Sequence, residues 1–410
     1  MEKDCEIEMK IVYINETCGT GSIGRLILDM MRKLDMQGIE TYCLYTKESS
    51  IDKNTIRVGN RFDKSIHAIL SRITGLQGYF SVLATYKMIK ELDVIQPDII
   101  HLHNLHANYI NLRMIFRYIK RNNIPIVITL HDCWFFTGKC TYFVAAKCYK
   151  WMKSCGQCPL LHIDNVNPTF FFDRTRKCLR DKKKWLYGLE KVAIIGVSKW
   201  ITEQAQKSIL ARFSPNVIYN WVDYNVFHLR DTKELRSRLG LKDKYILLMV
   251  CSRISNIKGF NVAVSLSERL DDSFQIIIIG KNSDKLLIPS NIIHIEYTNS
   301  TEELSQYYSL ADICINTTKY ETFGMVTAES MCCGTPVIVF DNTASPELVP
   351  EGCGYVVNEE CGIEGVINAI YDARKLGKDF FVEKCLKNSK TKFDSDYCIG
   401  QYVDLYRKML

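Results

Sequence analysis

Short runs of apolar, mostly β-branched residues alternate along the chain with longer segments whose apolar residues recur at helical spacing. A continuous apolar run suits a strand buried on both faces of a parallel sheet, and the amphipathic segments suit helices that cover the sheet. The alternation breaks near residues 220–230, so the two series predict two doubly wound α/β domains. The predicted strands are Lys10–Asn15, Thr41–Thr46, Ile99–His103, Pro125–Leu130, Val192–Val197, Val217–Tyr219, Tyr245–Cys251, Phe274–Ile279, Ile292–Glu296, Ile313–Asn316, Pro336–Phe340 and Tyr355–Val357.

The length of the chain and its final segment refine this organisation. At 410 residues the chain exceeds what one hydrophobic core usually supports, which favours two domains. The final segment, Asp394–Leu410, has apolar residues at helical spacing and no strand pattern. We therefore predict domains over residues 1–220 and 221–392, followed by a C-terminal helix over 393–410. Ligands of such folds lie beyond the carboxyl ends of the strands.

Charge is distributed unevenly between the two predicted domains. Residues 1–220 carry 32 Lys and Arg against 20 Asp and Glu, whereas residues 221–410 carry 21 against 26. A basic half favours an acidic substrate or an anionic surface. No nucleic-acid-binding motif accompanies it, so we favour an anionic membrane over nucleic acid. Phe170–Phe172, followed by cations over residues 174–184, fits a peripheral membrane contact; a solvated basic helix with a buried Phe anchor is the alternative.

The N-terminus and the cysteine content bear on the compartment. Met1–Met9 carries four acidic residues and lacks the apolar core of a signal peptide. The longest apolar runs, Tyr245–Cys251 and Gln275–Ile279, have the length of strands and not of membrane spans. Seventeen cysteines in such a chain suggest reduced thiols. We therefore expect a cytoplasmic location, with any lipid contact at the inner face of the cell membrane.

Four of the cysteines fall within nineteen residues. The pair Cys155 and Cys158 has the spacing that presents two thiolates to one tetrahedral zinc ion, and Cys140 and Cys148 could complete the ligand set. A structural zinc would brace the excursion over residues 133–170, which has little core of its own. Free cysteines and disulfides are the two alternatives.

A glycine pattern follows the first predicted strand. Gly19-Thr-Gly21-Ser22-Ile-Gly24 matches the Gly-x-Gly-x-x-Gly pattern of dinucleotide-binding folds, but the acidic residue expected after the second strand is only marginally supplied by Glu48. Three interpretations follow: a tight turn that lets a helix pack close to a strand, a loop whose N–H groups face a phosphate or an acceptor, and a nicotinamide site. The rest of the chain gives the third no support.

The segment Glu321–Glu329, after the predicted strand Ile313–Asn316, is the strongest candidate for chemistry. Gly324 permits close backbone approach, and the helix predicted after it offers N–H groups and a positive end to a diphosphate. Glu321 precedes that helix and Glu329 lies about a turn inside it. Two carboxylates would thus flank the phosphate-binding end and accept hydrogen bonds from sugar hydroxyls. Either acid alone would more often be an ordinary helix residue.

Two cations lie at the end of an earlier predicted strand. Arg253 follows the run Tyr245–Cys251, and Lys258 comes within a few residues of it. A guanidinium fork and an ammonium point charge form a sensible clamp for a diphosphate. In sugar transfer from a nucleotide sugar, such fixed charge stabilises the leaving diphosphate. The alternative is a pair of ordinary surface cations.

Together these features resemble glycosyltransferase family 4, a family of retaining enzymes with the GT-B fold. The resemblance covers nearly the whole chain. The segment His131–Gly138, with the cysteines after it, is further similar to a bacterial polysaccharide-assembly branch that includes colanic-acid-type transferases. The segments that carry the family resemblance are Gly21–Gly24, Ser198-Lys199-Trp200, Asn220-Trp-Val-Asp223, Arg253 to Lys258, Glu321-x-Phe323-Gly324-x4-Glu329 and Gly334-Thr335-Pro336-Val337.

The resemblance implies an α/β GT-B fold of two Rossmann-like domains and a hexosyltransferase-type enzyme. Such an enzyme moves a sugar, with retention, from a nucleotide-diphosphate sugar to a glycan or lipid-linked acceptor, here in surface or capsular polysaccharide biosynthesis. The donor is a substrate, and no cofactor is implied for catalysis. The resemblance also implies that the C-terminal helix crosses back to the N-terminal domain.

The resemblance assigns roles to matching residues. Arg253 and Lys258 would hold the diphosphate, Glu329 the ribose, and Glu321 the hydroxyls of the donor sugar. His131 matches a histidine that contacts the donor sugar near the reaction centre; a histidine that caps a strand end is the alternative. The implied donor-binding residues are Gly21, Ser22, Arg253, Lys258, Phe323, Gly324, Met325 and Glu329.

Two other classes of protein are alternatives to a transferase. One is a non-catalytic GT-B relative that binds a sugar nucleotide as a partner protein, against which the intact Arg253, Lys258, Glu321 and Glu329 argue. The other is a different enzyme on the same architecture, such as a sugar-nucleotide epimerase or a phosphorylase. A phosphorylase would need a pyridoxal-bearing lysine and a much longer chain.

Overall fold

The computed structural model describes residues 9–47, 52–163 and 168–410. Residues 1–8 and Glu48, which entered the predictions of compartment and dinucleotide binding, lie outside the described residues. The chain forms two compact units, one of residues 1–218 with 399–410 and one of residues 219–398. The first unit therefore takes in the last twelve residues of the chain.

Unit 1 is built on a parallel sheet with the strand order β3-β2-β1-β4-β5-β6-β7. The order runs outward in one direction from β1 and in the other from β4, which is the doubly wound arrangement. The central strands β1, β4 and β5 are almost wholly buried, as continuous apolar runs between two helical layers must be. The strands are β1 Lys10–Ile14, β2 Glu40–Tyr45, β3 Thr55–Arg57, β4 Ile99–Leu102, β5 Ile126–Leu130, β6 Val192–Gly196 and β7 Asn216–Val217.

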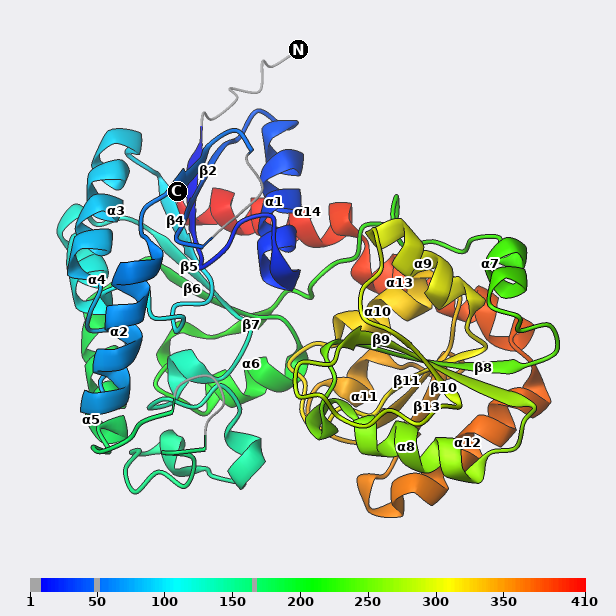
Figure 1. Cartoon of the computed structure of the whole chain (residues 1–410). Helices are drawn as coiled ribbons and strands as arrows, with labels where there is room; N and C mark the ends of the chain where they lie inside the picture. The colour runs from blue at the N-terminus through cyan, green and yellow to red at the C-terminus, as the bar shows by residue number, and fades with distance from the viewer. Residues whose placement is uncertain (1–8, 48–51, 164–167) are drawn as a thin grey trace, which may run out of the picture. The chain divides into compact units, whose positions relative to one another are not determined.

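Helices cover both faces of this sheet, with α1 and α14 on one side and α2 to α5 on the other (Figure 1). Polar residues begin several of them, since Asn60 and Asn111 accept hydrogen bonds from backbone N–H groups of α2 and α4. The helices are α1 Gly21–Asp35, α2 Arg61–Thr74, α3 Val82–Ile95, α4 Leu112–Asn122, α5 Thr175–Leu186, α6 Lys199–Gln206 and α14 Ser395–Met409.

Unit 2 repeats the same winding in a sheet of order β10-β9-β8-β11-β12-β13. Helices α8 and α12 lie on one face, and α9, α10 and α13 on the other (Figure 1). The elements are β8 Tyr245–Arg253, β9 Phe274–Lys281, β10 Ile292–Ile295, β11 Ile313–Asn316, β12 Val337–Phe340, β13 Gly354–Val357, α7 Lys233–Arg238, α8 Phe260–Arg269, α9 Thr301–Leu310, α10 Met325–Cys332, α11 Ser345–Leu348, α12 Gly362–Leu376 and α13 Asp379–Phe393.

The predicted α/β class with two doubly wound sheets is confirmed. All twelve predicted strands are present, with ends that shift by a few residues. The structure adds β3 at the edge of the first sheet, where a run of only three residues gave no apolar pattern to detect. The predicted C-terminal helix is α14, and its residues from Ile399 onward belong to unit 1.

Helix α14 is joined to the sheet of unit 1 by buried polar contacts. The Tyr406 hydroxyl lies 2.7 Å from His101 Nδ1, and His101 Nε2 lies 2.7 Å from Thr129 Oγ1. The Tyr402 hydroxyl lies 3.1 Å from the same threonine oxygen. Buried polar groups need such partners, so these contacts fix how α14 sits on β4 and β5.

The cysteine-rich excursion consists of short 3-10 turns at Trp134–Phe136, Phe143–Ala146 and Lys150–Met152. A buried lysine of α5 holds its first turn: Lys182 Nζ donates to the carbonyl oxygens of Trp134 at 2.5 Å and Thr137 at 3.0 Å. The ammonium also lies 3.4 Å from the centre of the Trp134 ring. Burial lowers the pKa of Lys182 to about 7.

Within the part of the chain that the structure describes, every helix is too short or too polar to span a bilayer.

The contact of Tyr406 with His101 predicts a specific loss of stability. In Tyr406→Phe the buried His101 Nδ1 loses its partner, so we expect the free energy of unfolding to fall by about 1–2 kcal/mol in urea denaturation. Tyr397→Phe, an exposed position on the same helix, is the control and should change stability by less than about 0.5 kcal/mol. Equal effects of the two variants would refute this role of Tyr406.

Candidate functional site

The predicted donor-site residues of unit 2 meet where the strand order of its sheet reverses. Strands β8 and β11 lie next to each other in parallel, with Ile313 beside Leu247. The chain leaves these two strands toward opposite sides, because β9 and β12 are their other neighbours. Such a reversal opens a crevice beyond the carboxyl ends of the strands. Lys258 follows β8 and Glu321 follows β11, so both lie at that edge.

Backbone hydrogen bonds hold the two loops together. The Lys319 N–H donates to the Ile257 carbonyl oxygen at 2.9 Å, one residue away from Lys258. Lys258 Nζ in turn donates to Glu321 Oε2 at 3.0 Å. The side chains are 36% and 18% exposed, so the pair is partly shielded and still accessible from solvent. The two residues predicted to bind different parts of a donor are therefore direct neighbours.

Gly324 joins this pair to helix α10. Its φ of 106° belongs to the left-handed region that favours glycine, and it allows the chain to turn directly into the helix at Met325. Glu321 and the first N–H groups of α10 thus lie within one short turn. The start of a helix offers unpaired N–H donors and a positive end, which suit an anion beside a lysine.

The two other charged residues predicted for the site in unit 2 have partners of their own. Glu329 is buried inside α10 and accepts a hydrogen bond from the Tyr308 hydroxyl at 2.9 Å. Burial, and then the charge of Glu329, raise the pKa of Tyr308, so this phenol stays a donor. Arg253 pairs with Asp284, and both side chains are well exposed. An exposed pair of this kind is weak and can exchange for a bound anion.

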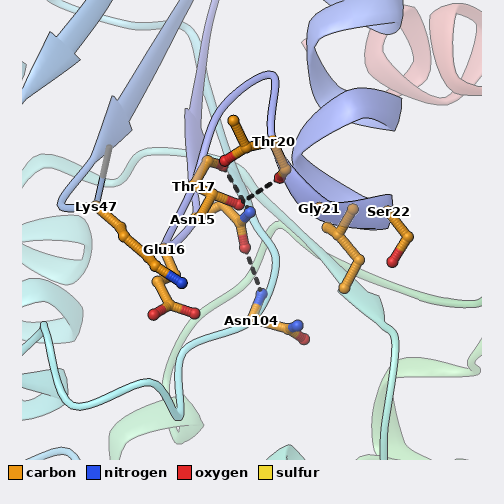
Figure 2. Close-up of a pocket in the computed structure, with 9 residues that line it drawn as sticks. Asn15, Glu16, Thr17, Thr20, Gly21, Ser22, Lys47 and Asn104 are labelled. Atoms are coloured by element: carbon orange, nitrogen blue, oxygen red, sulfur yellow. Dashed lines mark hydrogen bonds between the residues drawn. The ribbon is translucent and has the colours of Figure 1, made fainter. Parts of the chain in front are cut away.

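Unit 1 has a pocket at the corresponding reversal of its own sheet, between β1 and β4. Its volume is about 470 Å³. The start of α1 forms one wall, as Figure 2 shows, and Lys47 and Glu16 extend into the same space from the ends of β2 and β1. The lining residues are Asn15, Glu16, Thr17, Thr20, Gly21, Ser22, Ile23, Lys47 and Asn104.

Hydrogen bonds fix the loop that forms this pocket (Figure 2). Asn15 donates from Nδ2 to the Thr17 carbonyl at 2.8 Å and accepts at Oδ1 from the Asn104 N–H at 3.3 Å. Thr17 donates from Oγ1 to the Thr20 carbonyl at 2.9 Å. A side chain at Gly24 would collide with Thr17, since an added Cβ would lie 2.7 Å from its hydroxyl oxygen. The close-packing interpretation of this glycine pattern therefore has a structural basis, whereas anion binding by the loop stays a prediction.

His131 follows β5 and heads a stack of histidines in unit 1. His131 Nε2 lies 2.9 Å from His103 Nδ1, and His103 stacks on His101 with ring centres 4.2 Å apart. Desolvation lowers the pKa of His131 to about 4 and holds the pKa of the other two well below the ordinary value. All three rings are thus neutral near pH 7.

Beside this stack, Asp132 pairs with His106, with Oδ2 lying 2.7 Å from Nε2. The other carboxylate oxygen of Asp132 accepts the Trp134 N–H at 2.8 Å. Burial alone would lower the pKa of His106, but the neighbouring carboxylate raises it. The carboxylate and imidazole therefore form a charged pair next to the neutral His131.

Two protein-family models match the chain in succession. The model for glycosyltransferase family 4 matches residues 23–226, and that for group 1 glycosyl transferases matches residues 231–379. The chain is a GT-B glycosyltransferase.

One curated relative matches the chain over nearly its full length, and solved structures share its fold. The glycosyltransferase is 21% identical to a putative colanic acid biosynthesis glycosyl transferase, WcaC, of Escherichia coli K12, over 98% of this chain and all of that protein. Its structure is similar to sucrose-phosphate synthase of Thermosynechococcus elongatus, with a TM-score of 0.71, 16% identity and coverage of 98% and 99% of the two chains. It is also similar to Anabaena HepE in complex with UDP-glucose, with a TM-score of 0.68, 15% identity and coverage of 98% and 100%. The predicted GT-B fold is confirmed.

Several lining residues of the glycosyltransferase were not predicted from its sequence. Lys47 and Asn104 reach the pocket of unit 1 from the ends of β2 and β4, and His106 meets Asp132 from a different loop. One signal pointed toward them, because polar residues directly after buried parallel strands gather at one edge of a sheet.

The four cysteines of the excursion lie near one another without forming a ligand set. A hydrogen bond from the Cys140 thiol lowers the pKa of Cys158 to about 7, whereas burial raises the pKa of Cys155 to about 11. None of the four forms a disulfide. Among the described residues, no group of three or more Cys, His, Asp or Glu side chains is arranged to hold a metal ion. Structural zinc at Cys140, Cys148, Cys155 and Cys158 stays a prediction that this arrangement does not support.

The neutral state of His131 predicts that acid destabilises the enzyme. Unfolded histidine binds a proton near pH 6.5, whereas folded His131 does so near pH 4, so the unfolded state gains protons first as the pH falls. We expect this residue alone to reduce the free energy of unfolding by about 2 kcal/mol between pH 7 and pH 5 in urea titrations. His131→Gln removes the titrating group and should flatten the pH dependence by that amount.

The comparison of wild type with His131→Gln at each pH cancels the contribution of His106, whose raised pKa acts in the opposite direction. An unchanged pH dependence in His131→Gln would show that His131 is not held neutral by the fold.

Proposed function

We propose that this glycosyltransferase moves a hexosyl group from a nucleoside-diphosphate sugar to a hydroxyl group of a glycan or lipid-linked acceptor. The observation that carries the proposal is the contact between Lys258 and Glu321, at the place where the strand order of unit 2 reverses. This contact places a fixed cation and a carboxylate next to the start of helix α10. The cation and the start of the helix suit a diphosphate, and the carboxylate suits the hydroxyl groups of a sugar.

The diphosphate is held by cations and by the backbone. Lys258 supplies an ammonium, Arg253 a guanidinium that leaves Asp284 on binding, and Phe323, Gly324 and Met325 supply N–H groups. These groups gain most when negative charge builds up on the departing diphosphate. They therefore act on the rate of transfer as well as on donor affinity.

The two carboxylates have separate tasks. Glu321 accepts hydrogen bonds from the hydroxyls of the donor sugar, because its position before α10 keeps it at the accessible edge. Glu329 accepts hydrogen bonds from the ribose. Its hydrogen bond from Tyr308 fixes the position of the carboxylate, which favours a fixed ribose position.

Chemistry proceeds with retention in this proposal. The acceptor hydroxyl attacks from the face that the diphosphate leaves, and a diphosphate oxygen takes the proton of the hydroxyl. No protein nucleophile, metal ion or organic cofactor is required by this route. We assign to His131 a contact with the donor sugar near the reaction centre, in its neutral form. Gly21 and Ser22, at the start of α1, complete the set of donor-binding groups.

The relatives support a proposal for the biological setting. The E. coli protein that matches this chain over nearly its full length is a putative glycosyl transferase of colanic acid biosynthesis. We therefore place this enzyme in surface or capsular polysaccharide assembly, on the cytoplasmic side of the membrane, where nucleotide sugars are the donors.

Substitution of the central pair tests the proposal. Lys258→Ala removes positive charge from the leaving diphosphate, and Glu321→Ala removes an acceptor for the sugar hydroxyls. We expect each variant to lose roughly 100-fold or more in the rate of transfer or slow hydrolysis of a nucleotide sugar, measured by release of the nucleoside diphosphate.

Lys319→Ala is a matched control, because Lys319 is an exposed cation in the same loop as Glu321. It should retain activity within about twofold of wild type. Wild-type rates in both Lys258→Ala and Glu321→Ala would contradict the donor site. Nucleotide-sugar binding with neither transfer nor hydrolysis by the wild type would instead indicate a non-catalytic binding protein.

A further inference from the structure

Helix α2 of unit 1 is amphipathic in the reverse of the usual sense. Its apolar residues Phe62, Ile66, Ile69 and Ile73 are exposed, with Phe62 at 74% and Ile69 at 53%. Its buried residues are His67 and Ser71. At about 3.6 residues per turn the four apolar positions fall within roughly 60° of arc, so they form one continuous stripe. We call these four side chains the α2 stripe.

A second exposed apolar group adjoins the end of the α2 stripe. Phe170, Phe171 and Phe172 are all more than half exposed. The Phe170 N–H donates to the Arg72 carbonyl oxygen at 2.7 Å, and Gly75 lies so close to Phe172 that an added Cβ would be 2.0 Å from its carbonyl oxygen. The phenylalanines therefore lie directly against the C-terminal end of α2. The alternative of a buried Phe anchor does not describe this structure.

A basic pocket of about 530 Å³ follows the phenylalanines along the chain. Asp173 also lines it, but this carboxylate accepts the N–H groups of Cys158 and Thr175. Asp181 pairs with Lys177 and Arg180. The four cations still outnumber the two carboxylates, so the pocket keeps an excess of positive charge. The cations that line it are Arg174, Arg176, Lys177 and Arg180.

We propose that the α2 stripe, Phe170–Phe172 and the basic pocket together bind the surface of an anionic lipid bilayer. Aliphatic and aromatic side chains enter the boundary between headgroups and acyl chains, and the adjoining cations attract lipid phosphates. The combination distinguishes a bilayer from a protein partner: the apolar stripe alone would suit either, but a basic pocket of headgroup size beside it fits anionic lipid. The proposed surface contains none of the residues assigned to donor binding, and binding to lipid goes beyond the transfer reaction.

Charge and apolar contact should both contribute to binding. Phe172 lies under the Arg174 guanidinium, with 5.7 Å between the guanidinium carbon and the ring centre, so one cation directly overlies an apolar anchor. Binding should therefore increase with the anionic lipid content of the vesicle and decrease as the salt concentration rises. The binding that remains at high salt would come from the apolar contact.

Co-sedimentation of the full chain with vesicles tests the proposal. The probes are vesicles of phosphatidylcholine alone and vesicles with about one third phosphatidylglycerol. We expect the wild type to sediment with the anionic vesicles and to bind neutral ones at least roughly tenfold more weakly. The triple variant Ile66→Gln, Ile69→Gln, Ile73→Gln should lose roughly tenfold or more in affinity for the anionic vesicles. Gln is a good helix former, and these positions are exposed, so the fold should be kept.

A matched triple variant controls for the general loss of exposed apolar surface. Met36→Gln, Val94→Gln and Leu287→Gln alter side chains that are at least as exposed and lie outside the proposed surface. This variant should bind as the wild type does. For charge, Arg174→Glu with Arg180→Glu should abolish the preference for anionic vesicles, whereas Lys242→Glu with Lys375→Glu, at exposed positions of unit 2, should keep it.

Three results would overturn the proposal. The first is no sedimentation of the wild type with anionic vesicles. The second is equal binding by the α2 triple variant and its matched control. The third is a wild-type dimer in solution, by light scattering, that the α2 triple variant converts to a monomer, since the stripe would then be an interface between copies of this chain. Nucleotide-sugar turnover, measured without lipid, should be the same in all these variants, so failure here is distinguishable from failure of the proposed activity.

Discussion

Both units of this glycosyltransferase depend on the reversal of strand order in a parallel sheet. Two neighbouring strands send their connections to opposite sides, so the loops after them line a crevice that no connection crosses. In unit 2 the strands are β8 and β11, and the reversal brings Lys258 to Glu321 across 63 positions of sequence. In unit 1 they are β1 and β4, and the reversal forms the pocket lined by Asn15 and Asn104. The topology of each sheet thus decides where the candidate site residues lie, and their side chains decide what they can bind.

Unit 1 also shows how buried polar groups couple distant segments. His131 contacts His103, which stacks on His101, and His101 contacts Tyr406 of the last helix. Removal of any partner would leave a buried nitrogen or hydroxyl without compensation, so the contacts support one arrangement of β4, β5 and α14. The last residues of the chain are therefore part of the framework around the candidate site histidine.

Much of the fold could be predicted because buried parallel strands are continuous apolar runs. Strands such as Ile126–Leu130 and Ile313–Asn316 stand out for that reason, whereas the edge strand Thr55–Arg57 has too few apolar residues to do so. The predicted donor-site residues could be recognised from the sequence because Glu321, Gly324 and Glu329 lie close together along the chain. Lys47 and Asn104 could not, because only the strand order brings them together.

Two further features show what periodicity and spacing leave open. The apolar spacing along α2 indicates a stripe, but it does not indicate which side of the helix packs against the protein. In the structure the stripe is exposed. The spacing of Cys155 and Cys158 suits a zinc ion, but whether Cys140 and Cys148 complete the set depends on the path of a long loop.

We propose above all that Lys258, Glu321 and the start of α10 form a donor site that requires a diphosphate. Calorimetric binding of a nucleoside diphosphate and the matching monophosphate to wild type and Lys258→Ala tests it most directly. We expect the wild type to bind the diphosphate more tightly than the monophosphate. Lys258→Ala should lose roughly tenfold or more in affinity for the diphosphate and much less for the monophosphate. Equal affinity of the two proteins for the diphosphate, across the common nucleotide bases, would contradict it.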